Sequence, residues 1–305
     1  MSGRLIVQEV SPRDGLQIEP VWVPTDDKVK LIDGLSGAGF TRIEAGSFVS
    51  PKAIPALRDG AEVFSRIRRA PGVIYVALIP NLKGAQRALD AQADELNLVL
   101  SASHAHNRAN MGMTVEDSLA AFDSIVALAA DRSDVSLNGT VATAFGCPFQ
   151  GSIDEDRVLS LVERYLALGI TGITLADTTG MANPRQVARL VGKVLERVSP
   201  QALTLHFHNT RGLGLANVLA AYDVGARRFD AALGGLGGCP FAPGASGNIC
   251  TEDLVNMCDE MGIETGIDLP LLIELSRGLP QLLGHETAGQ VAKAGRNCDL
   301  HPIPA

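Results

Sequence analysis

Two histidines separated by a single residue, His206 and His208, carry the strongest chemical signal in the sequence. They lie in an apolar run typical of a β-strand, in which residues two apart point to the same side. A hydrogen-bonded pair in the core is one interpretation. With a strand-end carboxylate such as Asp14, however, the two imidazoles are better explained as ligands of a metal ion. Nitrogen and oxygen ligands without a thiolate favour Mg²⁺ or Mn²⁺, with Zn²⁺ or Fe²⁺ as alternatives.

The adjacent charges of Arg13 and Asp14 form the second signal. An exposed ion pair in a loop is one interpretation, and such pairs contribute little to stability. Glu9 precedes them in the same strand-like run, and Glu44 ends the next one. Buried carboxylates need cations, which Arg13 and a divalent metal would supply. Arg13 is then available to stabilise negative charge that develops during a reaction.

Cys239 follows a segment, residues 234–238, that contains four glycines. Glycines allow the backbone to approach a substrate closely, and a thiol on such a loop suits acid–base chemistry. The spacing alone leaves a buried, inert thiol as the alternative. His104 and His106 share the spacing of the other histidine pair, but their polar surroundings predict a solvated loop. We expect buried, inert thiols at the four remaining cysteines, Cys147, Cys250, Cys258 and Cys298.

Strand-like and helix-like segments alternate along the chain. Near-continuous apolar runs predict eight strands, at Leu5–Val10, Thr41–Ala45, Ile74–Ile79, Asp94–Leu100, Ser136–Thr143, Gly172–Ala176, Leu203–His208 and Arg228–Ala232. The segments between them predict helices at Thr25–Gly37, Ala56–Arg69, Lys83–Ala91, Val115–Ala130, Asp154–Leu168, Pro184–Val198 and Leu213–Val224. Eight such units favour an α/β fold of the (β/α)₈ TIM barrel type, and a doubly wound open sheet is the alternative.

The pattern changes after Gly238. Helices near Glu252–Met261 and Leu269–Leu283 predict the eighth barrel helix and a small C-terminal helical appendage. We therefore expect a catalytic barrel over residues 1–284, including the loop at 234–248, and a tail over residues 285–305.

Polar residues at the predicted strand ends define the expected site, because TIM barrels carry their chemistry at the carboxyl ends of the strands. Glu44 and Asp177 supply carboxylates there. We expect four residues to bind the substrate: Arg13, Gln17, Ser47 and Thr178.

Composition excludes several classes of protein. The 305 residues are 46% hydrophobic and include only five cysteines, which excludes a disordered chain and a disulfide scaffold. A net charge of −8 argues against nucleic-acid and membrane-surface partners. No signal-like segment opens the chain, so we expect a cytoplasmic protein. A homo-oligomer, either a dimer or a tetramer, is expected from base rates.

The motifs as a group resemble those of the 3-hydroxy-3-methylglutaryl-CoA lyases, which belong to a larger group of metal-dependent aldolase and Claisen-type barrels. The resemblance runs from about Leu5 to Leu283. It rests on residues 9–17 (EVSPRDGLQ), 47–52 (SFVSPK), 80–84 (PNLKG), 146–149 (GCPF) and 235–241 (GLGGCPF), and on the His206/His208 pair.

The resemblance implies a role for each matched residue. Asp14, His206, His208 and Asn248 match the family's divalent-metal ligands. Arg13 matches the arginine that stabilises the enolate of the departing acetyl-CoA, and Cys239 matches the cysteine that transfers a proton. His206 also serves in proton transfer. Glu44 and Asp177 match acidic residues that support catalysis.

The implied reaction is a retro-Claisen cleavage of an acyl-CoA substrate, with hydroxymethylglutaryl-CoA giving acetyl-CoA and acetoacetate. Another 3-hydroxyacyl-CoA such as citramalyl-CoA is the alternative substrate. A Claisen-type synthase and a non-catalytic metal-binding barrel are alternative functions. The acyl group stays open because four residues differ from the family's usual pattern where a substrate carboxylate or tail is expected: Ile18, Asn138, Asn209 and Arg211.

Overall fold

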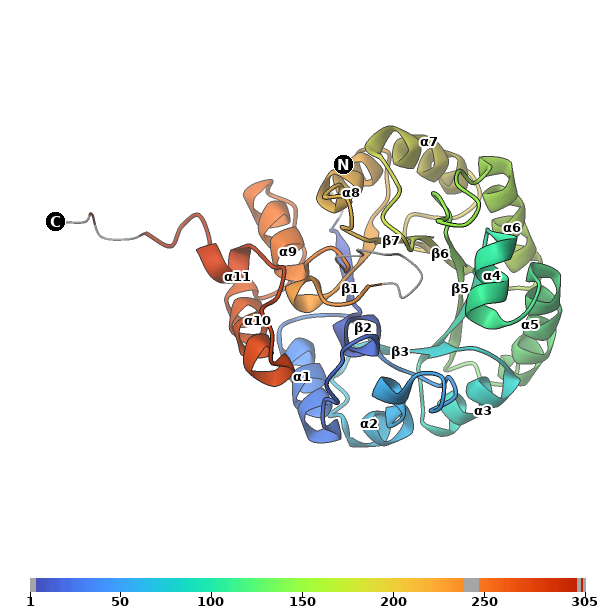
Figure 1. Cartoon of the computed structure of the whole chain (residues 1–305), viewed down its shortest axis with the longest axis horizontal. Helices are drawn as coiled ribbons and strands as arrows, with labels where there is room; N and C mark the ends of the chain where they lie inside the picture. Colours follow the sequence, from blue (N-terminus) through green and yellow to red (C-terminus); the bar gives the residue numbers. More distant parts are fainter. Residues whose placement is uncertain (1–3, 239–246, 301–302, 304–305) are drawn as a thin grey trace.

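Eight parallel strands close into a barrel in chain order, so the predicted TIM barrel is confirmed and the open sheet is excluded. The computed structural model describes residues 4–238, 247–300 and 303 (Figure 1). The strands are β1 (Ile6–Glu9), β2 (Arg42–Ser47), β3 (Ile74–Ile79), β4 (Glu95–Ser101), β5 (Ser136–Ala142), β6 (Gly172–Asp177), β7 (Leu203–Phe207) and β8 (Arg228–Ala231). Each begins and ends within two residues of its predicted bounds.

Helices surround the barrel and follow the strands that precede them (Figure 1). They are α1 (Thr25–Gly37), α2 (Gly60–Arg66), α3 (Leu82–Asp90), α4 (His104–Met111), α5 (Val115–Ala129), α6 (Glu155–Ala167), α7 (Pro184–Leu195), α8 (Gly214–Asp223), α9 (Thr251–Glu260), α10 (Leu269–Leu283) and α11 (Val291–Ala294). The last three pack together on one side of the barrel, where α9 and α10 correspond to the predicted eighth barrel helix and the predicted C-terminal appendage. None of the helices in the described ranges combines the length and apolar character that crossing a bilayer requires.

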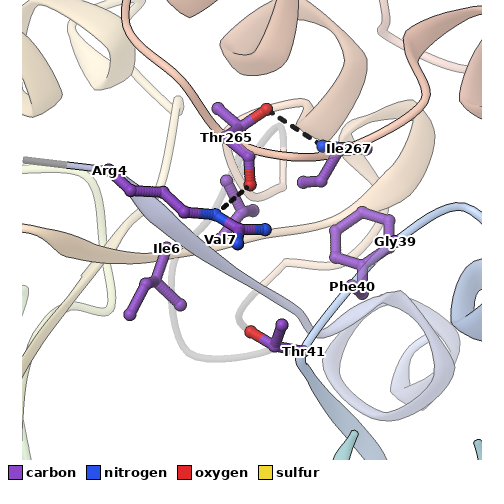
Figure 2. A pocket seen from close by; sticks show the side chains of 8 residues that line it. All are labelled: Arg4, Ile6, Val7, Gly39, Phe40, Thr41, Thr265 and Ile267. Carbon is purple, nitrogen blue, oxygen red and sulfur yellow. Dashed lines mark hydrogen bonds between the residues drawn. The ribbon is translucent and has the colours of Figure 1, made fainter. Parts of the chain in front are cut away.

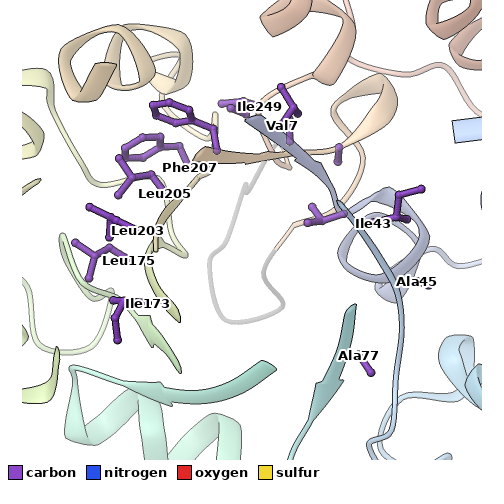
Figure 3. Packing of buried hydrophobic residues seen from close by; sticks show 14 of the residues in the cluster. Val7, Ile43, Ala45, Ala77, Ile173, Leu175, Leu203, Leu205, Phe207 and Ile249 are labelled. Carbon is purple, nitrogen blue, oxygen red and sulfur yellow. The ribbon is translucent and has the colours of Figure 1, made fainter. Parts of the chain in front are cut away.

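The apolar core lies between the strands and the surrounding helices rather than inside the barrel. Outward-facing strand residues such as Ile43, Leu175 and Leu205 are buried there, and Figure 3 shows them on the outer side of the ring. Barrel interiors are usually filled by branched apolar residues. Here polar side chains occupy this interior, so the prediction of near-continuous apolar strands is wrong for the inner face.

Hydrogen bonds connect the polar side chains inside the barrel. Asn97 donates to Glu44 at 3.2 Å, and Asn138 donates to Asn97 at 3.0 Å and to Thr174 at 2.9 Å. Asn138 pairs with Gly172, the first residue of β6, so it lies toward the amino ends of the strands. Asn138 thus lies away from the carboxyl ends of the strands, where TIM barrels carry their chemistry, and its place near a bound acyl group stays a prediction.

The amino-terminal mouth of the barrel contains a cavity of about 130 Å³ between β1, β2 and the segment before α10. Figure 2 shows the Arg4 guanidinium across it, donating to the Thr265 carbonyl at 3.0 Å. Residues at this end of a TIM barrel generally serve stability rather than catalysis.

The segment around His106 is a helix, and the prediction of a solvated loop is wrong for this residue. Ser103 caps α4 by accepting from the His106 amide at 3.1 Å. His106 is buried, with its Nδ1 2.7 Å from Ser101 Oγ, whereas His104 is exposed as expected. Burial lowers the pKa of His106 to about 4.

We expect acid to destabilise the fold through His106. Its pKa is lower in the folded than in the unfolded chain, so the stabilisation is fully present above pH ~6.5 and is lost as the pH falls toward 4. One such group changes the free energy of unfolding by at most about 1.4 kcal/mol per pH unit. Urea denaturation between pH 7 and 4.5 should show a shallower pH dependence for His106→Gln, and the same slope as wild type for His104→Gln. Equal slopes for all three proteins would contradict the prediction.

Candidate active site

A wide turn at the end of β1 positions Arg13 and Asp14. Residues Ser11–Gly15 form a π-helical turn, in which the amides of Asp14 and Gly15 donate to the Val10 carbonyl at 2.8 and 3.2 Å. Such turns are rare and frequently occur at functional sites. Both charged side chains are buried, so the interpretation of an exposed loop pair is excluded.

Arg13 is held by two carboxylates. Its Nε and Nη2 lie 2.7 and 2.6 Å from Glu44 Oε2, and its Nη1 donates to Asp14. Burial alone lowers the pKa of Arg13, but Glu44 and Asp14 outweigh this and raise it above its usual value. Burial raises the pKa of Glu44 despite the opposing effect of Arg13. The guanidinium is therefore a fixed positive charge that is largely shielded from water.

Glu9 does not belong to this cluster, contrary to the expectation from sequence. Its carboxylate accepts from the Ser11 amide at 2.8 Å, the Leu233 amide at 3.0 Å and the Thr251 hydroxyl at 2.7 Å. Burial raises its pKa to about 7. Glu9 thus ties β1 to the segments that follow β8 and has no contact with Arg13.

The predicted metal ligands come together at the carboxyl ends of β1 and β7. Single ligand atoms from Asp14, His206 and His208 all lie within 4.8 Å of one another. His208 Nε2 is 3.0 Å from His206 Nε2 and 3.7 Å from Asp14 Oδ2. Asn248 reaches the cluster through a backbone bridge with His208, and its Nδ2 donates to Asp14 Oδ2 at 2.7 Å.

The electrostatics of these residues fit a cation. Two facing Nε2 atoms accommodate a single proton or a positive ion between them, but not two hydrogens. Burial would raise the pKa of Asp14, yet Arg13 and the two histidines hold it well below its usual range. Asn248 Oδ1 is buried without a partner among the described residues. A carboxylate, two imidazoles and an amide oxygen therefore fit a divalent metal.

The backbone at Gly237 lies directly against this cluster. Its φ is +103°, and a Cβ at this position would lie 2.6 Å from Asn248 Nδ2 and 3.0 Å from the Asp14 carbonyl. No other residue type tolerates both the backbone conformation and the space. Gly237 thus permits close packing against two of the proposed ligands, whereas close approach of the glycines to a substrate stays a prediction.

Sequence reasoning missed Asp230, which lies in the middle of β8. Its Oδ2 is 3.1 Å from His206 Nδ1, and the side chain is buried. The sequence predicts only a strand over Arg228–Ala232 and no role for its carboxylate. A carboxylate between the apolar residues Phe229 and Ala231 was an available signal.

Asp177 is buried at the end of β6. Its Oδ1 accepts from the amides of Met181 and Ala182 at 2.8 and 3.1 Å, while Oδ2 has no partner among the described residues. Burial raises its pKa to about 6. Asp177 therefore has a free carboxylate oxygen and a pKa close to neutral.

The other predicted substrate contacts lie at strand ends, but their hydrogen bonds are to the protein. Thr178 Oγ1 accepts from the Thr143 amide at 3.0 Å, and Ser47 Oγ accepts from the Val49 amide at 3.4 Å. Gln17 is half-buried. Substrate binding by these three residues stays a prediction.

Two of the residues that differ from the family pattern point away from the metal ligands. Asn209 is exposed, and its Oδ1 accepts from the Gly214 amide at the start of α8. Arg211 donates to the carbonyls of Thr179 and Gly180. Whether Asn209 and Arg211 influence the choice of acyl group stays a prediction. Ile18 is 41% exposed in the loop after β1.

Cys239 lies outside the described residues, so its predicted role is untested. The predicted burial of the other thiols is confirmed for Cys147, Cys250 and Cys258, but Cys298 is exposed because it lies in the tail after α11.

Comparisons with known proteins agree with this geometry. The HMGL-like family matches residues 4–278. A hydroxymethylglutaryl-CoA lyase of Bacillus subtilis is 41% identical over 281 residues, which span 92% of this chain and 94% of that protein. The (R)-citramalyl-CoA lyase of Chloroflexus aurantiacus is 44% identical over 300 residues, covering 95% and 94%.

One solved structure is more similar still. It is an HMG-CoA lyase from Acenitobacter baumannii in complex with coenzyme A and 3-methylmalate, with 71% sequence identity. The match has a TM-score of 0.97 and covers 100% of this chain and 99% of that chain.

Proposed function

Because the chain belongs to the HMGL-like family, we propose that it is a metal-dependent carbon–carbon lyase that cleaves hydroxymethylglutaryl-CoA into acetyl-CoA and acetoacetate. The main supporting observation is the buried Arg13–Asp14 pair, which lies against His206, His208 and Asn248 at the carboxyl mouth of the barrel. This arrangement combines a metal site with a fixed positive charge, as a reaction through an enolate requires.

We assign the ligands of the ion to Asp14, His206, His208 and Asn248. A bound divalent ion would acidify the substrate's tertiary hydroxyl and hold it in place. Mg²⁺ or Mn²⁺ suits this mixed set of nitrogen and oxygen donors, and Zn²⁺ is the alternative.

Arg13 stabilises the charge that develops when the bond breaks. The electron pair of the bond between C2 and C3 of the acyl group moves onto the thioester, which becomes an enolate. A guanidinium held in one orientation by Glu44 stabilises this charge without having to reorganise first. In this scheme Glu44 acts through Arg13.

Two proton transfers complete the reaction. The substrate hydroxyl loses a proton, and the free oxygen and near-neutral pKa of Asp177 suit a group that accepts it. The family resemblance also gives His206 a part in proton transfer, which it could take only while one of its two ring nitrogens is free. The enolate carbon gains a proton, which we assign to Cys239 from the family resemblance. Gln17, Ser47 and Thr178 are proposed to contact the substrate.

Citramalyl-CoA is the second candidate substrate. The similarity to a citramalyl-CoA lyase and the 3-methylmalate in the 71% identical structure favour it. In citramalyl-CoA the carbon that bears the hydroxyl carries its carboxylate directly, so cleavage gives pyruvate instead of acetoacetate.

A panel of 3-hydroxyacyl-CoA thioesters tests the proposal. Purified protein with Mg²⁺ or Mn²⁺ should release acetyl-CoA together with acetoacetate from hydroxymethylglutaryl-CoA, and EDTA should abolish this activity. Faster release of pyruvate from citramalyl-CoA would favour the second candidate. Net condensation from acetyl-CoA would favour a synthase, and no turnover of any thioester would contradict a lyase.

We also propose a cytoplasmic homo-oligomer, either a dimer or a tetramer. Size-exclusion chromatography with light scattering tests the assembly, and a monomer at micromolar concentration would contradict it. Fractionation of the source cells tests the compartment.

Replacing Cys239 with alanine is expected to lower kcat at least about tenfold, because a proton donor to the enolate carbon is lost. Metal content should be unchanged, since a thiol is not among the proposed ligands. Steady-state kinetics and metal analysis on the same preparation check both parts. Cys298→Ala, which changes an exposed thiol, is the control. Undiminished turnover of Cys239→Ala would refute the role.

A further inference from the structure

In each proposed histidine ligand, Nδ1 is the ring nitrogen that faces away from the other ligands. Within the described ranges, Asp230 is the only residue whose carboxylate bonds to either of these Nδ1 atoms. Its Oδ2 lies 3.1 Å from His206 Nδ1, while His206 Nε2 faces the other ligands. The side chain is only 7% exposed. Burying a carboxylate in a barrel interior is costly unless it has a charged or hydrogen-bonded partner. This cost calls for a role beyond packing.

The hydrogen bond determines which nitrogen of His206 carries the hydrogen. An ionised carboxylate can only accept, so the Nδ1 of His206 must donate. In a neutral ring this leaves a lone pair on Nε2, the atom that faces His208 Nε2 at 3.0 Å. A ring with its hydrogen on Nε2 would instead direct that hydrogen at the cation site.

The two histidines differ in this respect. His208 Nδ1 is buried without a partner among the described residues. Its ring contacts are made by Nε2, which lies 3.0 Å from His206 Nε2 and 3.7 Å from Asp14 Oδ2. Within this pair, the ring whose Nδ1 is held by a carboxylate is therefore that of His206.

The charges around Asp230 also fit a divalent ion. Asp14, Glu44 and Asp230 carry three negative charges, and Arg13 is the positive residue that contacts two of them. Among these four side chains negative charge is in excess, as a site for a cation requires. Asp230 thus supplies one of the charges that balance the ion without occupying a ligand position.

We propose that Asp230 is a positioning residue that holds His206 with its hydrogen on Nδ1 and so presents Nε2 to the metal. This inference rests on the proposed metal-dependent function. Outer carboxylates that orient a ligating histidine commonly change metal affinity by about 10–100-fold.

Asp230→Asn is the test, because asparagine keeps the shape but can donate a hydrogen to Nδ1. The ring is then free to carry its hydrogen on Nε2. Titration with Mn²⁺, followed by electron paramagnetic resonance without substrate, should show about 10–100-fold weaker binding. In the metal-free protein, ¹⁵N NMR of His206 should show the hydrogen on Nδ1 in the wild type and on Nε2 in the variant.

Glu95→Gln is the matched control. Glu95 is another buried carboxylate inside the barrel, but it pairs with Arg42 and Ser136 and bonds to no histidine. The control should keep wild-type Mn²⁺ affinity and the Nδ1 form of His206. A similar loss in both variants would assign the effect to barrel charge in general and overturn the proposal.

Two further results would overturn the positioning role. One is unchanged Mn²⁺ affinity in Asp230→Asn. The other is a wild-type His206 with its hydrogen on Nε2, which can be measured even if the variant does not fold. If the wild type binds no Mn²⁺ at all, the proposed metal-dependent function fails and this inference fails with it. Inactivity toward every thioester, with Mn²⁺ binding retained, would contradict the lyase alone.

Discussion

Arg13→Gln is expected to lower kcat about 100- to 1,000-fold, the effect typical of removing one preorganised group that stabilises an oxyanion. The guanidinium is buried and held by Glu44 and Asp14, so no water replaces it easily. KM should change much less than kcat, because the lost interaction strengthens only as the enolate forms. Steady-state kinetics with the preferred thioester measures both constants.

Stability must be separated from catalysis in this variant. Arg13→Gln leaves Glu44 buried without its cation, which typically costs about 3–5 kcal/mol. The double variant Arg13→Gln/Glu44→Gln removes both charges, so it should recover much of the melting temperature while kcat stays low. Recovery of kcat together with stability would show that Arg13 is structural.

A second buried pair provides the control. Arg42 and Glu95 also form an ion pair inside the barrel, but they lie at the amino end of the strands. The double variant Arg42→Gln/Glu95→Gln should keep kcat close to that of the wild type. A large loss of kcat there would mean that any change of charge inside the barrel impairs turnover.

Asp14→Asn is expected to abolish metal binding and, with it, activity. The variant loses the only carboxylate among the four proposed ligands and disturbs the contacts with Arg13 and Asn248. Loss of an outer-sphere partner alone costs about 10–100-fold in affinity, so loss of a direct ligand should cost more than about 100-fold. Equilibrium dialysis with Mn²⁺ measures this directly.

Thermal melts give an independent measure of the same loss. Mn²⁺ should raise the melting temperature of the wild type, because a ligand that binds only the folded state stabilises it, and this shift should vanish in Asp14→Asn. Glu9→Gln is the control, since Glu9 is a buried carboxylate before the same turn and bonds to Ser11, Leu233 and Thr251 instead. Full metal stoichiometry in Asp14→Asn would show that the ligand assignment is wrong.

The sequence was sufficient for the ring of strands and for part of the site. Strand boundaries were predictable because turn-forming residues flank short apolar runs, as at Ile74–Ile79, where prediction and structure coincide. The His206/His208 pair followed from the two-residue period of a strand. Asn248 joins them only through a bridge across forty residues of chain, a contact that no local pattern encodes.

The features that the sequence did not predict depend on tertiary structure rather than on a local pattern. Helix α4 has a good cap in Ser103, but its sequence lacks the apolar period that marks a helix, and tertiary packing of His106 and Asn107 stabilises it instead. Similarly, Asp230 was missed because its role depends on which side of a strand faces the barrel interior. That property follows from closure of the whole ring and not from neighbouring residues.

The cluster of proposed ligands brings together the segments that follow β1 and β8, the two strands that close the ring. Asp14 follows β1, and Asn248 comes after β8, the strand that pairs with β1. During synthesis, a chain that still lacks β8 has no last neighbour for its first strand, and a chain that still lacks residue 248 has an incomplete set of proposed donors. Full affinity for the proposed ion is therefore expected only after the ring of strands has closed and the segment after it has been made.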